Sequence, residues 1–98
     1  MKHIYKNQSA LRITMNTKID LKGITKCEIR YQKPDGATGA FNAGIIDESQ
    51  GIICHDVVSS SEIDVCGKWV LWAAISFTDG RCATGRSVAL YVYEEGRD

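Results

Sequence analysis

The stretch that decides the fold runs from Gly67 to Arg81 and reads GKWVLWAAISFTDGR. Because a β-strand places alternate side chains on opposite faces, its spacing of apolar residues predicts a core-facing strand of about ten residues. The Asp79-Gly80 pair that follows is typical of a tight hairpin turn. We therefore expect a returning strand near Ser87 to Tyr93. The apolar residues of the first strand's inner face are Trp69, Leu71, Ala73, Ile75 and Phe77.

The opposite face of this hairpin is apolar as well. A strand with one face in solvent normally carries polar residues on that face. We therefore expect the outer face to be a surface that meets another protein. The alternative is that the N-terminal segment, with Ile4 and Tyr5, covers this face without any partner. The predicted interface residues are Val70, Trp72, Ala74, Tyr91 and Tyr93.

The other segments indicate short strands separated by turns. Lys33-Pro34-Asp35-Gly36 has the sequence of a type I turn, and no segment shows the sustained 3.6-residue period of a helix. About seven short strands in roughly 100 residues predict an all-β fold, an immunoglobulin-like antiparallel β-sandwich that forms a single domain over residues 1–98. A small closed barrel is the structural alternative, because strand count does not separate the two. The further strands are expected at 9–15, 25–32, 39–46 and 52–57.

The charge balance of the chain excludes several classes of partner. Twelve basic and twelve acidic side chains cancel within 98 residues, so no global field attracts nucleic acid or an acidic membrane surface. No apolar run of about eighteen residues is present to cross a bilayer. The N-terminus lacks the apolar block of a secretory signal. We expect folding in a reducing cytoplasm, with neither nucleic acid nor membrane as a partner.

Four cysteines could pair in three ways if this were a secreted scaffold. Without an export signal, reduced thiols are expected. The spacing contains no C-x₂-C or H-x₃-H pair, in which structural zinc sites usually gather their ligands. The sequence therefore predicts no metal and no cofactor. The cysteines are Cys27, Cys54, Cys66 and Cys82.

The adjacent Cys54 and His55 suggest a nucleophile and its base at first sight. Neighbours on a strand point to opposite faces, however, and cannot share a hydrogen bond. A packed cysteine beside a half-buried histidine is the simpler interpretation. No other group of residues forms a catalytic constellation, so we predict no catalytic residues and no enzymatic activity.

Several turn and strand motifs follow one another between residues 18 and 93. In this order they resemble small structural proteins of tailed bacteriophages, and most closely the N-terminal domain of the phage baseplate upper protein family. That resemblance implies a β-sandwich virion component without catalytic residues that works by attachment. The motifs are Asp20-Leu21-x-Gly23, Lys33-Pro34-Asp35-Gly36, Ile63-Asp64-x-x-Gly67-x-Trp69 and Phe77-x-Asp79-Gly80.

The sequence thus leads us to expect a bacteriophage virion structural protein. It would be a non-enzymatic docking module of the tail or baseplate, or a capsid decoration protein of the head. Its partners would be other virion proteins and further copies of itself in a homo-oligomer, and it would be made in the host bacterial cytoplasm. The alternative is a surface-recognition module that binds carbohydrate or a host receptor through its loops.

Overall fold

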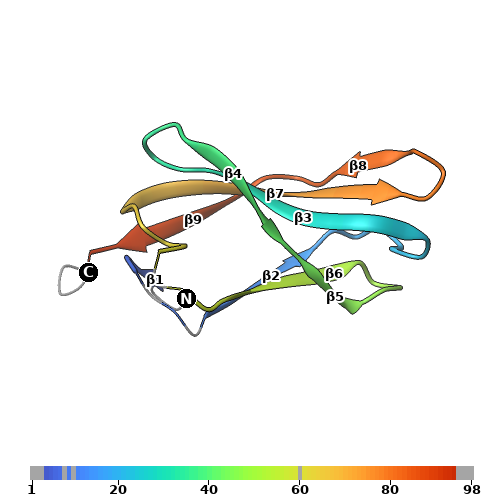
Figure 1. The fold of residues 1–98 in the computed structure, drawn as a ribbon, viewed down its shortest axis with the longest axis horizontal. Coiled ribbons are helices and arrows are strands. Elements are labelled where there is room, and N and C mark those ends of the chain that lie inside the picture. Colours follow the sequence, from blue (N-terminus) through green and yellow to red (C-terminus); the bar gives the residue numbers. More distant parts are fainter. Residues whose placement is uncertain (1–3, 8, 10, 60, 95–98) are drawn as a thin grey trace.

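A computed structural model describes residues 4–7, 9, 11–59 and 61–94, which form two facing β-sheets (Figure 1). Sheet A has the strand order β1-β9-β7-β3-β4, and β8 also pairs with β7. Sheet B has the order β2-β6-β5. No helix that could span a membrane is found among the described residues. The strands are β1 (Ile4–Tyr5), β2 (Leu11–Asn16), β3 (Ile24–Gln32), β4 (Thr38–Asn42), β5 (Gly44–Asp47), β6 (Ile52–Val57), β7 (Gly67–Phe77), β8 (Cys82–Thr84) and β9 (Val88–Tyr93).

The path of the chain through the two sheets is that of an immunoglobulin-like sandwich. Strands β2, β6 and β5 correspond to strands B, E and D of that fold, and β3, β7 and β9 correspond to C, F and G. The short β1 runs parallel to β9, whereas the other pairings are antiparallel. The all-β, immunoglobulin-like sandwich predicted from the sequence is confirmed, and the closed-barrel alternative is wrong.

Strand β7 forms the predicted hairpin, but its returning partner is divided. The turn closes with a hydrogen bond of 2.8 Å from Phe77 N to Arg81 O, and Gly80 has a φ of 88°. Strand β8 then pairs with residues 74–76 and β9 with residues 67–71. The sequence predicted only the second of these strands, so the break at residues 85–87 is a new feature.

The predicted strand 39–46 is two strands in two different sheets. Figure 1 shows β4 in the upper layer continuing into β5 in the lower one. The chain changes sheet at Ala43, whose N–H donates to the carbonyl of Cys27 at 3.2 Å. Phe41 is buried, but Ile45 is 43 % exposed, so the two residues do not both face the core, although alternation along a single strand would place them on one face. The alternation of apolar and polar residues continues where the chain passes from one sheet to the other. The sequence pattern therefore does not reveal the change of sheet.

The core lies between the sheets and centres on Trp69, which is completely buried. The Tyr31 ring lies 5.3 Å from the Trp69 ring and 4.6 Å from the Phe41 ring, measured between centroids. The indole Nε1 of Trp69 donates to the carbonyl of Val65 at 2.8 Å. The ammonium of Lys33 lies 5.5 Å above the Trp69 ring, a cation–π arrangement. The apolar surface of Trp69 is therefore buried, and its indole N–H has a hydrogen-bond acceptor.

Candidate functional site

The five predicted interface residues lie on the outer face of sheet A. Facing residues in the strand register share a face, and Tyr91 faces Lys68 while Val70 faces Ala89. Tyr91 is 50 % exposed, and the three residues from β7 are half-buried. Alternation therefore separated the outer face from the core correctly. Whether this face binds anything stays a prediction.

We call these five residues of β7 and β9 the apolar strip. A row of charged residues on β3 borders the strip. Arg30 faces Trp72 and Glu28 faces Ala74 in the register of the two strands. Glu28 is paired with both Lys26 and Arg30, at 3.5 Å in each case. Positive charge therefore lies beside the aromatic residues of the outer face. The signal was in the sequence, since the charged residues of 25–32 all alternate onto one face.

The charged row and the strip together line a shallow groove across β7, β3 and β4. Trp72 lies at one side of the groove and Ala40 at the other, with Arg30 between them in the register. On the β4 side the groove is lined by the small side chains of Ala40 and Thr38, so it is shallow there. The outer face of sheet A therefore combines aromatic, small and charged residues on one surface.

In the described part of the N-terminal segment, Ile4 and Tyr5 lie beside this surface and not over it. Strand β1 pairs with β9 at the edge of sheet A, with Ile4 facing Val92 and Tyr5 facing Tyr93. Ile4 packs against the core, and the register places Tyr5 on the outer side beside Tyr93. The sequence alternative in which Ile4 and Tyr5 shield the face is wrong, because the segment widens the sheet instead.

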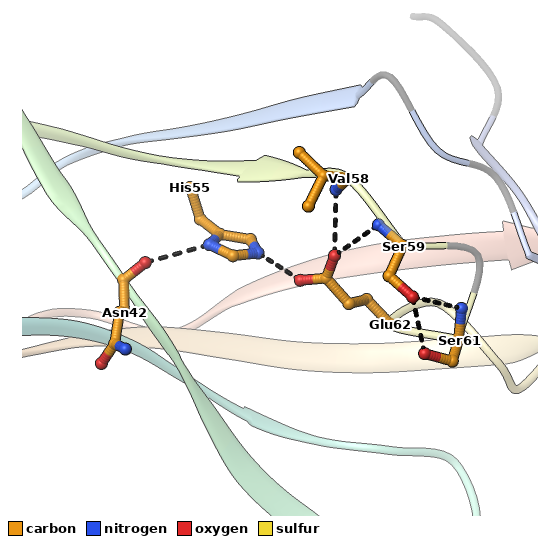
Figure 2. A network of polar contacts seen from close by, with 6 residues as sticks. All are labelled: Asn42, His55, Val58, Ser59, Ser61 and Glu62. Carbon is orange, nitrogen blue, oxygen red and sulfur yellow. Dashed lines mark hydrogen bonds and ion pairs between the residues drawn. The ribbon is translucent and has the colours of Figure 1, made fainter.

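A second polar feature joins β4, β6 and the connection that follows β6 (Figure 2). His55 Nδ1 lies 2.9 Å from the carbonyl oxygen of Asn42, and Nε2 lies 2.6 Å from Glu62 Oε1. The second carboxylate oxygen of Glu62 accepts the N–H groups of Val58 and Ser59, at 3.0 and 2.9 Å. The His55 ring also stacks on Phe41, with 4.4 Å between centroids. This arrangement fastens the 58–62 connection to the sandwich.

The chemistry of this network follows from its acceptors. Hydrogen bonds, chiefly from the Ser59 N–H, hold the pKa of Glu62 below its ordinary value. A carbonyl and an ionised carboxylate only accept hydrogen bonds, so both bonds of His55 are donated at once only by the doubly protonated imidazolium. Both ring nitrogens are thus engaged. Ser59 Oγ lies 2.8 Å from Ser61 Oγ, so this hydroxyl is engaged with its neighbour.

The four cysteines lie at different depths, and none is bonded to another in this structure. Cys27 is buried and contacts the carbonyl of Ala43 at 3.5 Å, and burial raises the pKa of its thiol. Cys82 is exposed, and the other two are half-buried. Among the described residues, no group of three or more His, Cys, Asp or Glu side chains is placed to hold a metal ion. The predictions of thiols and of no metal remain open to experiment.

The strand order defines the chain as an immunoglobulin-like β-sandwich. Among solved structures, it is similar to the crystal structure of CopC from Methylosinus trichosporium OB3b. The two share 12 % sequence identity with a TM-score of 0.62, over 98 % of this chain and 86 % of that one. At this identity the likeness establishes a shared fold. No family model matches the sequence, and no curated protein does.

The expected role as a bacteriophage virion protein is wrong. The similar structure is that of CopC and not of a tail, baseplate or head protein. The motifs behind the phage resemblance are mainly turns here: residues 33–37 join β3 to β4, and residues 78–81 join β7 to β8. Turns of this kind are needed by any antiparallel sandwich. The order of these motifs therefore indicates the fold, and it gives no evidence of a role in a virion.

Proposed function

We propose that this protein is a non-enzymatic interaction module that binds a second copy of itself through the outer face of sheet A. The observation that carries the proposal is the continuous strip of half-exposed aromatic and small apolar residues on β7 and β9. The strip is bordered by the mixed charges of β3.

The composition of the strip supports binding to a folded protein. Trp, Tyr and Arg are the residue types enriched at the energetic centres of protein interfaces. Here Trp72 faces Arg30 across the register, and Tyr91 is half exposed. Ala89 and Ala74 flank these large side chains on the same face, so the strip is low enough for a second flat surface to approach.

The distribution of charge favours a second copy over a strongly charged partner. The chain has a formal net charge of zero, so two copies do not repel each other at long range. The row Lys26, Glu28, Arg30 alternates in sign and can complement itself when two copies are offset by one residue pair. A two-fold interface uses the same patch on both subunits and needs such self-complementarity.

Sedimentation of the full chain tests this proposal. We expect a dimer that dissociates on dilution, and Trp72→Ala should raise the dissociation constant at least tenfold, as for an interface anchor. Ile46→Ala is the matched control, because Ile46 is 50 % exposed but lies on β5 in the other sheet. It should leave the dimer unchanged. A monomer at all concentrations, or a dimer indifferent to Trp72→Ala, overturns the proposal.

A further inference from the structure

Strand β2 forms one edge of sheet B. Among the strands that the structure describes, it pairs only with β6. In immunoglobulin sandwiches a first strand A belongs to the sheet of B, E and D, but here the short β1 pairs with β9 in sheet A instead. Within the described chain, the outer edge of β2 therefore offers backbone N–H and C=O groups to an added strand.

A cleft of about 470 Å³ lies beside this edge. Its apolar lining comes from Met15 of β2, Ala73 of β7 and Val88 of β9. Met15 and Ala73 are core residues, so the cleft reaches the space between the sheets. The size is that of a typical ligand pocket. Lys18 and Arg86 also line it, and no acidic residue is found among its described lining residues.

The break between β8 and β9 creates this cleft. Pairing with β7 stops after Thr84, Gly85 N donates to Ala73 O at 2.9 Å, and pairing resumes at Val88. A Cβ placed on Gly85 would lie 3.4 Å from the Cβ of Ala73. Two small residues therefore meet where the sheet edge opens, and larger ones would fill the opening.

The backbone at Lys18, two residues after the end of β2, is held in one conformation. Lys18 has a φ of 58°, a left-handed conformation that non-glycine residues rarely adopt. Its N–H donates to Asn16 Oδ1 at 2.9 Å, which stabilises this conformation. The chain thus turns sharply at Lys18, beside the cleft, and ends the free edge of β2.

We propose that this cleft binds an extended peptide of a partner protein, which adds as a strand to the edge of β2. Its backbone would pair with β2, and an apolar side chain would enter the cleft over Met15 and Ala73. An acidic residue of the peptide would meet Lys18 and Arg86. Strand addition of this kind draws affinity from main-chain hydrogen bonds and specificity from alternate side chains. The positive charge of the cleft selects an apolar-and-acidic sequence.

A labelled synthetic peptide tests this inference on the full chain. The probe is a seven-residue peptide of alternating valine and glutamate, with two comparison peptides that carry lysine for glutamate or a central proline. We expect amide resonance changes in β2 and residues 85–88 with the first peptide. The lysine peptide should bind at least tenfold more weakly, and proline should abolish binding because it removes a strand hydrogen bond.

Two variants separate the cleft from other surfaces. Arg86→Glu should weaken binding at least fivefold by reversing one charge, whereas Arg81→Glu, on the exposed β7–β8 turn, should not. Gly85→Val should weaken binding by filling the opening, with the folded state checked by its circular dichroism spectrum. Resonance changes that avoid β2, or equal binding of the proline peptide, overturn the inference. So does full competition by hexanoate, which would indicate a small-molecule cleft.

Discussion

Strand β7 places large apolar residues on both of its faces, and the two faces have different surroundings. Trp69 on the inner face is completely buried against Tyr31. Trp72, three residues later, is half-buried on the outer face beside Arg30. The same residue type on the same strand thus lies once in a core and once on a surface. The facing sheet, and not the hydrophobicity of the residue, decides which positions become core.

Replacing each tryptophan gives the largest contrast between the two faces. Trp69→Ala should destabilise the protein by about 3–5 kcal/mol, because it leaves a large cavity in the core. Trp72→Ala should cost about 1 kcal/mol or less, since only part of its surface is buried. Urea unfolding of both variants measures the difference. Equal losses of stability would show that the outer face is an ordinary internal layer.

Two carboxylates allow a comparison of a half-buried with an exposed position: Glu62 in the connection after β6, and Asp56 on β6. Glu62→Gln should cost about 1–3 kcal/mol, because the carboxylate receives bonds from His55 and two backbone N–H groups. Asp56→Asn should cost much less, although its bond to Arg12 is 2.7 Å long, because both side chains are more than half exposed. Thermal unfolding of the two variants tests this order. A larger effect at Asp56 would contradict it.

The contribution of Glu62 should depend on pH in one direction. Hydrogen bonds lower its pKa in the folded protein from the ordinary 4.5. The carboxylate therefore stabilises the fold fully above about pH 4.5, and this stabilisation is lost as pH falls through the lowered pKa. The stability gap between the natural protein and Glu62→Gln should narrow from pH 6 to pH 3. A gap that stays constant over this range would disprove the role of the charge.

The thiols extend the comparison to reactivity. Cys27 should react with a thiol reagent at least tenfold more slowly than Cys82, since it is buried and its pKa is raised by burial. Single-cysteine variants measured by absorbance give the two rates. After denaturation without reductant, the natural protein should show four reactive thiols. A count of two or zero would reveal disulfides.

Local alternation predicted several strands to within one residue or so. The 52–57 prediction coincides with β6 (Ile52–Val57), and 25–32 lies within β3 (Ile24–Gln32). In β3, charged residues alternate with the buried Cys27 and Ile29. The division of the returning strand at Gly85 and the change of sheet at Ala43 were not predictable in this way. Both depend on which strand lies alongside, and a local pattern contains no information on that.

The candidate site was predictable to a similar degree. Alternation placed Trp72 and Tyr91 on the outer face, but it could not show that Arg30 of β3 lies opposite Trp72. That neighbour is set by the pairing of strands 42 positions apart. The bond between His55 and Glu62 was not predicted either, because it depends on how the 58–62 connection folds back.

The parallel pairing of β1 with β9 has a mechanical consequence. When the chain is pulled apart from before β1 and after β9, the two strands slide along each other in opposite directions. Shear of this kind loads their hydrogen bonds together, including the 2.8 Å bond from Lys6 N to Tyr93 O. Strands peeled apart from one end would instead break them one at a time. The first resistance of this sandwich to stretching therefore lies where the two residues of β1 pair with the end of β9.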